Sequence, residues 1–347
     1  MSDEQAEERL LSAEIDAALA GRRLDQALAA LFPDYSRSRL QVWIREGRVT
    51  VDGKVRAQRH KVSEGEQLVL RAVEEAQVEC VPQPVPLRIL FEDEHLLVID
   101  KPAGLVVHPA AGNPDGTLQN GLLYHDPSLA RLPRAGIVHR LDKDTTGLMV
   151  VARSEPAYQR LVAALARREI HREYRALVVG RLRAPGTVDQ PIGRHPTVRT
   201  RMAVNPLGKP AVTHYEPLEA FREHTLLRVR LETGRTHQIR VHMAYIRHPV
   251  FGDPVYGGRL QLPSGADEEL KALMRSFGRQ ALHARRLILR HPVDERELRF
   301  EAPIPQDMGE LLEALRRHRE AHETPDLDPA FYTALGEAGW EIDDDED

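Results

Sequence analysis

The residues best suited to chemistry lie in a short charged insert between two apolar runs. Residues 137–151 read IVHRLDKDTTGLMVV, with Asp142 between Arg140 and Lys143. The periodicity predicts buried strand-like segments on both sides, and Asp-Thr-Thr-Gly is typical of the turn between them. Neighbouring cations favour the ionised form of a carboxylate. Asp142 would then be a fixed, ionised carboxylate, which suits a nucleophile or a base.

An Asp before Thr-Thr-Gly also fits a plain turn, in which its oxygens accept backbone N–H groups. Resemblance to a known family favours the chemical interpretation. Residues 139–148, HRLDKDTTGL, resemble the signature motif of the RluA-type pseudouridine synthases. The usual pattern has Ser more often than Thr at the position of Thr146, so the hydroxyl is kept. The resemblance implies that Asp142 is the catalytic residue.

A second segment, HREYRALVVG at residues 171–180, is predicted to be a strand. Its alternation places Tyr174 and Ala176 on one face. Burial habits alone make a Tyr here a core or rim residue. The segment resembles the family strand whose Tyr stacks against the target base, and a base that leaves its helix needs such an aromatic face.

A third segment, LETGRTHQIRVHMA at residues 231–244, contains Arg240. A buried Arg needs an anionic partner, and Asp142 is the natural candidate. Bidentate pairing would orient the carboxylate and favour its charged form, a role that the resemblance also implies. Pairing with another acid for stability alone is the alternative. The resemblance favours a helix here, capped by Thr236, although alternation also permits a strand.

Residues 16–75 are predicted to form a small module of two helices and several strands. Ser36 or Ser38 can cap the second helix, and residues 49–55 predict a hairpin with an Asp-Gly turn. Ten Lys or Arg stand against four Asp or Glu between Arg22 and Lys61. The segment SRSRLQVWIREGRVTVDGK resembles the S-four RNA-binding domain. The residues expected to bind RNA are Arg37, Arg39, Arg45 and Arg48. The alternative is that these arginines form only a solvated helix face.

The remaining organisation follows from composition. Residues 76–87 contain three prolines and are predicted to be an extended linker. Residues 88–318 mix short strands with helices, which predicts an α+β domain. The resemblance implies the pseudouridine synthase fold, a mixed, largely antiparallel sheet with flanking helices. Residues 248–258, HPVFGDPVYGG, are predicted to be a structural loop near the site.

Charge is unevenly distributed along the 347 residues. The net charge is −5, but residues 320–347 hold eleven Asp or Glu and no Lys or Arg. Without that tail and the first fifteen residues, 47 basic residues face 37 acidic ones. A basic body between acidic ends, predicted at 1–15 and 319–347, suits a polyanionic partner. The tail itself could equally be a disordered, solubilising end.

Several classes of protein are not indicated by the sequence. No apolar run approaches the ~18–20 residues of a membrane span, and one cysteine, Cys80, permits no internal disulfide. The acidic start lacks the layout of a signal peptide, so a cytoplasmic location is expected. His237 and His242 are five apart, which is not the spacing of a helical zinc pair. We therefore expect no metal and no cofactor.

The resemblance implies isomerisation of uridine to pseudouridine in large-subunit (23S) ribosomal RNA, in the stem-loop called helix 69. The expected partner is that RNA or the assembling large subunit, and a monomer is expected. Arg140 is expected to contact RNA near the target nucleotide. Two other functions remain open, an assembly factor that only binds RNA and an RNA hydrolase or glycosylase that uses the same Asp142.

Overall fold

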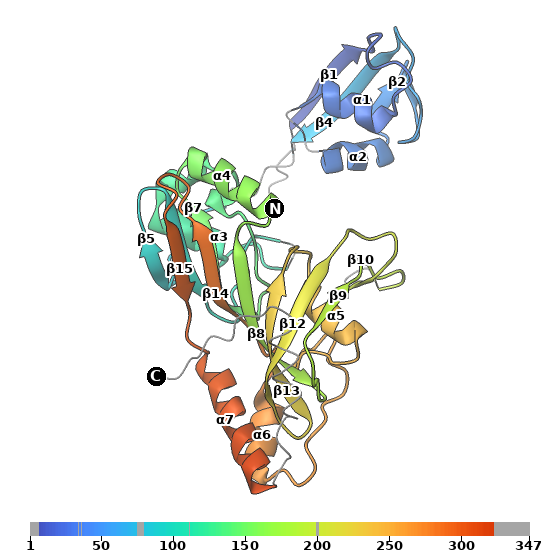
Figure 1. Cartoon of the computed structure of the whole chain (residues 1–347). Coiled ribbons are helices and arrows are strands. Elements are labelled where there is room, and N and C mark those ends of the chain that lie inside the picture. The colour runs from blue at the N-terminus through green and yellow to red at the C-terminus, as the bar shows by residue number, and fades with distance from the viewer. Residues whose placement is uncertain are drawn as a thin grey trace, which may run out of the picture. The chain divides into compact units, whose positions relative to one another are not determined.

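The computed structural model describes residues 7–33, 35, 37–74, 80–110, 112–198 and 201–322. They divide into two compact units between Glu79 and Cys80 (Figure 1). Three predicted features lie wholly or mostly outside the described residues: the acidic tail, the first half of the linker and the capping residue Ser36. In the described part of the chain, no helix is long and apolar enough to cross a membrane.

The first unit is a four-stranded antiparallel sheet with two helices packed on it. The strand order is β1-β4-β2-β3. The hairpin predicted at residues 49–55 is confirmed, and Asp52 and Gly53 both have positive φ, as a tight type I′ turn requires. The elements of this unit are β1 (Glu7–Glu14), α1 (Leu24–Leu31), α2 (Arg37–Arg45), β2 (Val49–Val51), β3 (Lys54–Val55) and β4 (Gln67–Glu74).

Strand β1 departs from the prediction, which placed residues 1–15 outside the module. It pairs antiparallel with β4 over its whole length. Hydrophobic alternation does not reveal it, because Leu10 is 68% exposed and Leu11 is only partly buried. Backbone hydrogen bonds to the edge of β4 supply the pairing that the side-chain pattern does not announce.

The second unit is built on one large sheet, in which only β7 and β14 pair in parallel. The predicted mixed, largely antiparallel sheet is therefore confirmed. Its order is β5-β6-β7-β14-β8-β13-β12-β9, with β15 beside β14. The strands are β5 (Ile89–Glu92), β6 (Leu96–Lys101), β7 (Thr146–Ala152), β8 (His171–Val179), β9 (Gly186–Asp189), β12 (Val212–Ala220), β13 (His224–Leu231), β14 (Leu282–Arg290) and β15 (Glu297–Glu301).

Helices flank this sheet, and a separate pair of strands lies beside it. In Figure 1, α3 and α4 accompany β5 and β7, whereas α6 and α7 lie together at the opposite end. Helix α7 ends at Ala321, three residues into the predicted acidic tail. The elements are α3 (Leu118–His125), α4 (Glu155–Ala166), α5 (Gln238–Tyr245), α6 (Glu268–Ser276), α7 (Gln306–Ala321), the 3-10 turns η1 (Pro127–Arg131) and η2 (Pro133–Gly136), and the pair β10 (Ile192–Arg194) and β11 (Met202–Val204).

Central strands explain the apolar runs that flank the charged insert. Every residue of β6 and β7 is buried, as expected for strands covered on both faces. The upstream flank was predicted to be strand-like but contributes only one bridge, between Ile137 and Val151. Gly147 has φ of 109°, and a Cβ there would lie 2.2 Å from the Ala284 carbonyl oxygen. Glycine therefore permits the β7–β14 pairing that fixes the end of the insert.

Candidate active site

Asp142 lies in the loop that enters β7, and its side chain is 16% exposed. The turn closes through a hydrogen bond from the Thr145 N–H to the Asp142 carbonyl, at 3.1 Å. One wall of a cavity of about 710 Å³ is formed by this loop. The carboxylate is thus fixed at a concave surface but still reachable from solvent.

Side chains from distant segments hold the loop after Asp142. Lys101 Nζ donates to the Lys143 carbonyl at 2.8 Å, and Arg279 Nη1 donates to the Asp144 carbonyl at 3.3 Å. Gln280 Nε2 donates to Thr145 Oγ1 at 3.0 Å. Arg279 is itself fixed by a bidentate pair with Asp307, in the first turn of α7. The end of β6, the segment that precedes β14 and the first turn of α7 therefore position this one loop.

Arg240, on α5, reaches the carboxylate as predicted. Its Nη1 donates to Asp142 Oδ2 at 2.9 Å. The predicted bidentate geometry with Asp142 is wrong, because the guanidinium forks onto Asp253 instead, at 2.6 and 2.9 Å. Burial opposes the charge, but the bond to Asp253 and the charge of Asp142 outweigh it and raise the pKa of Arg240. One cation is thus shared by two carboxylates.

Asp253 completes this arrangement from the Gly-Asp-Pro loop. Its side chain is fully buried. Besides Arg240, it accepts the backbone N–H groups of Val255 and Tyr256, at 2.8 and 3.0 Å. Burial raises the pKa of Asp253, but the Arg240 bond and these N–H groups lower it further than burial raises it. The segment predicted to be merely structural therefore anchors the cation that contacts Asp142.

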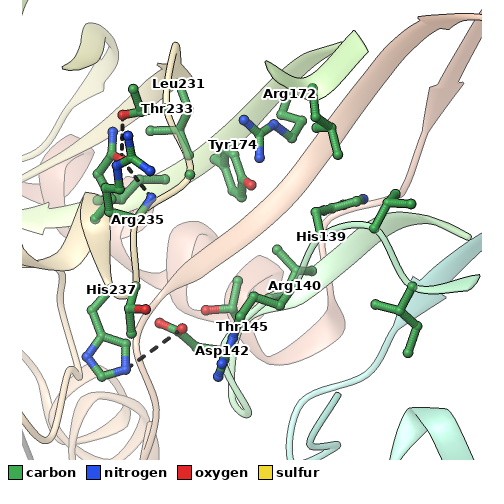
Figure 2. A pocket seen from close by; sticks show the side chains of 18 of the residues that line it. His139, Arg140, Asp142, Thr145, Arg172, Tyr174, Leu231, Thr233, Arg235 and His237 are labelled. Atoms are coloured by element: carbon green, nitrogen blue, oxygen red, sulfur yellow. Dashed lines mark hydrogen bonds and ion pairs between the residues drawn. The ribbon is translucent and has the colours of Figure 1, made fainter. Parts of the chain in front are cut away.

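His237 and Tyr256 enclose the same ion pair from the other side. His237 Nε2 lies 3.9 Å from Asp142 Oδ1, as the dashed line in Figure 2 marks. Its Nδ1 is 2.9 Å from Tyr256 Oη, and the Arg240 guanidinium lies 5.1 Å from the Tyr256 ring centre. His237 is the N-cap of α5, with φ of 57°, so the predicted cap by Thr236 is wrong. Burial lowers the pKa of His237.

Tyr174 lines the cavity from strand β8, across from Asp142 (Figure 2). As the alternation predicted, Tyr174 and Ala176 lie on one face of the strand, and both are buried. Burial raises the pKa of Tyr174, so its hydroxyl stays neutral. The structure thus brings Asp142, Tyr174 and Arg240 to one cavity, from three separate segments.

The predicted RNA-contacting arginines fall into two groups. Arg140 is exposed and lines the same cavity as Asp142. The other four belong to the first unit, and each has a partner there. Arg37 Nη2 lies 3.0 Å from the buried Asp25, Arg48 Nε lies 3.1 Å from Glu46, Arg45 donates to the Gln41 carbonyl, and Arg39 lies over Trp43.

This arrangement suits carboxylate chemistry on a planar group. An arginine orients the carboxyl group of Asp142, and a buried aromatic ring faces the same space. Among the described residues, no group of three or more His, Cys, Asp or Glu side chains has a geometry that could hold a metal ion. The described groups therefore offer a nucleophile or base, a cation to orient it and a stacking surface.

Sequence reasoning missed several residues that build this site. Asp253 was assigned to a turn, since Gly-Asp-Pro is common in turns. Lys101 and Arg172, which lies at the cavity wall, were given no role from the sequence. A Lys at the end of a continuous apolar run was the available signal for Lys101, because a buried ammonium requires several acceptors.

Lys101→Met is expected to lower the free energy of unfolding by about 3 kcal/mol. Lys101 is 1% exposed and donates to the carbonyls of Pro102, Leu105 and Lys143 at 2.8, 2.9 and 2.8 Å. Burial lowers the pKa of Lys101 to about 7, but three acceptors match the three N–H groups of its charged form. The loss is expected because the variant leaves three carbonyls unsatisfied. Urea denaturation measures the free energy of unfolding.

Lys271→Met is the matched control. Lys271 pairs with Glu268, which is 82% exposed, so its removal should change the free energy of unfolding by less than about 0.5 kcal/mol. Equal losses in the two variants would contradict the structural role of Lys101.

Comparisons with known proteins identify the families that the chain resembles. The RNA pseudouridylate synthase family model matches residues 95–245, and the S4 domain model matches residues 22–68. The chain is 59% identical over 313 residues to ribosomal large subunit pseudouridine synthase D of Escherichia coli K12, covering 90% of this chain and 96% of that protein. The protein of the same name from Pseudomonas aeruginosa is 58% identical over 310 residues, with 89% and 97% covered.

A solved structure agrees with these matches. Human RNA pseudouridylate synthase domain containing 4 superposes with a TM-score of 0.53 and 27% identity. The match covers 66% of this chain and 93% of that one.

Proposed function

The chain belongs to the RNA pseudouridine synthase family, and we propose that it isomerises uridines in the helix 69 stem-loop of large-subunit (23S) ribosomal RNA. The family predicted from the charged insert is thereby confirmed, as is the S-four domain. The names of the relatives support the choice of large-subunit RNA. Helix 69 rests on the resemblance of the motifs.

One observation carries the proposed chemistry, the Asp142 carboxyl group held by Arg240 at a cavity that Tyr174 also lines. The reaction breaks the N1–C1′ bond of uridine, turns the base and forms a C5–C1′ bond. A proton leaves C5 and N1 gains one, so the RNA mass is unchanged. Asp142 would act on the ribose or the base, and Arg240 would orient it.

The proposed partner is large-subunit ribosomal RNA or an assembling large subunit, recognised in part by the basic first unit. Arg37, Arg39, Arg45 and Arg48 lie on or just after α2, and Arg140 lies at the cavity. Such arginines contribute sequence-independent affinity for phosphates. The proposal includes a monomer that works in the cytoplasm without a cofactor.

The proposal is tested with the purified full chain, large-subunit ribosomal RNA free of pseudouridine, and no added metal or cofactor. We expect pseudouridines in the helix 69 loop and an unchanged RNA mass by mass spectrometry. Pseudouridines at other positions would overturn only the assignment of helix 69 as the target, and not the proposed reaction. Cleaved RNA or released uracil would instead support the hydrolase or glycosylase alternative, and RNA binding without conversion would support a binding protein.

Tyr174→Leu is expected to lower kcat/KM for the RNA by about 5- to 150-fold, because stacking of a base on an aromatic ring contributes about 1–3 kcal/mol. Tyr174→Phe keeps the ring and should stay within about threefold of the wild type. Single-turnover assays on the same RNA measure both variants. Equal losses would argue against stacking and for a role of the hydroxyl.

A further inference from the structure

Arg172 is a cavity residue whose charge is not neutralised by any described residue. It lines the cavity from β8, two positions before Tyr174 and on the same face of the strand. Its Nε is sealed from solvent and has no hydrogen-bond partner among the described residues. A buried donor without an acceptor destabilises the folded protein, and more so when it is charged. The free protein therefore keeps this donor at a cost that a ligand could offset.

Other arginines at the cavity differ in this respect. Arg168 pairs with Glu232, and Arg235 Nε donates to the Pro210 carbonyl at 2.9 Å. Arg240 is neutralised by its two carboxylates. Arg134 and Arg140 are exposed, so water can satisfy them. Glu173, next to Arg172 in sequence, projects from the opposite face of β8 and pairs with Arg175 there.

Gly234 leaves room for the Arg172 guanidinium because it has no side chain. A Cβ at this position would lie 3.0 Å from Arg172 Nη1 and 3.7 Å from Nη2. The guanidinium therefore lies directly over the backbone of the loop that follows β13. The absence of a side chain at Gly234 leaves the fork free to face the cavity.

His139 supplies a second donor beside Arg172. Its Nε2 accepts the Val150 N–H at 3.0 Å, so its proton resides on Nδ1. That Nδ1 is also sealed and has no partner among the described residues. Burial, and then the charge of Arg172, lower the pKa of His139 to about 3, which keeps the ring neutral. Figure 2 shows Arg172 on the side of Tyr174 away from Asp142, and His139 to the right of the Tyr174 ring.

We propose that Arg172, with the Nδ1–H of His139 beside it, binds the RNA backbone phosphate adjoining the uridine whose base stacks on Tyr174. A guanidinium fork matches two oxygens of one phosphate. A phosphate bound close to Asp142 would instead be repelled by that carboxylate. Arg172 and Tyr174 are same-face neighbours on β8, about 6.6 Å apart, so a phosphate on Arg172 would lie beside the stacked base. This inference rests on the proposed function, since it assigns a binding role within the same site.

The test uses a short ribosomal RNA hairpin chosen because the wild-type enzyme converts one of its uridines. Arg172→Gln should raise KM by about 10- to 100-fold and leave kcat within about threefold, since it removes uniform binding. Arg172→Lys keeps the charge but not the fork, so its KM should be intermediate. Arg299→Gln removes an exposed arginine that is paired with Glu297 on β15 and does not line the cavity, so its KM should stay within about twofold.

Gly234→Ala is a second variant that leaves Arg172 in the chain. The added methyl displaces only the flexible end of a side chain, so the protein should fold and KM should rise by about threefold or more. Matching circular dichroism spectra and unfolding midpoints check that each variant is folded. An unchanged KM in both Arg172→Gln and folded Gly234→Ala would overturn the inference.

Neutral methylphosphonate linkages on either side of the target uridine identify the contact. One of them should raise KM for the wild type by about tenfold, and have little further effect on Arg172→Gln, as expected when both changes remove one contact. Equal penalties in wild type and variant at both linkages would contradict phosphate binding by Arg172. Failure of the proposed function is distinguishable, because the wild type would then convert no ribosomal uridine at all.

Discussion

Asp142→Asn is expected to lower the rate of pseudouridine formation by about 10⁴-fold, while RNA affinity stays within about threefold of the wild type. The amide keeps the shape of the side chain but cannot act as a nucleophile or base. Arg240 remains paired with Asp253, so the cavity should keep its form. Single-turnover kinetics on the ribosomal RNA and filter binding measure the two quantities.

Asp144→Asn is the matched control for this substitution. It changes a carboxylate in the same loop, two residues further along, whose backbone carbonyl holds the loop to Arg279. Its activity should stay within about threefold of the wild type. If Asp142→Asn forms pseudouridine within tenfold of the wild-type rate, Asp142 has no catalytic role. If both variants lose activity, the loss comes from the fold of the loop.

Arg240→Met is expected to abolish activity and to lower the free energy of unfolding by about 3–5 kcal/mol. Arg240 is 5% exposed and lies between Asp142 and the fully buried Asp253. Removing the cation leaves Asp253 charged and uncompensated in the interior, which is the costly way to break a buried pair. Chemical denaturation followed by circular dichroism measures the change.

The double variant Arg240→Met with Asp253→Asn separates charge from packing. Neutralising Asp253 should recover a large part of the lost stability, because the uncompensated carboxylate is gone, while activity stays absent. If both variants unfold at the same denaturant concentration, the loss comes from the missing side-chain packing. The shared-cation account of Arg240 would then be wrong.

The loop and the identity of its partner were predictable, whereas the supports of the loop were not. The motif around Asp142 placed a carboxylate between apolar runs, and β7 follows it as expected. A helix containing Arg240 was predicted, and the contact with Asp142 is present. These succeeded because each rests on a local pattern or on the need of a buried arginine for an anion.

The sequence does not indicate which distant partners these side chains and strands contact. Arg240 binds Asp253 with two of its nitrogens and Asp142 with the third, a division that depends on the approach angle of α5. Lys101 meets the loop from β6, 42 positions earlier in the chain. Strand β1 is stabilised by backbone pairing to β4, which the side-chain pattern does not encode. Tertiary placement decides all of these.

The central claim, that Asp142 converts uridines of helix 69, is tested most directly by mapping pseudouridines in large-subunit ribosomal RNA. The RNA is taken from cells that lack the protein and from the same cells supplied with the wild type or Asp142→Asn. We predict that the helix 69 pseudouridines are absent without the protein, return with the wild type and stay absent with the variant. Their presence without the protein, or their return with Asp142→Asn, would contradict the account.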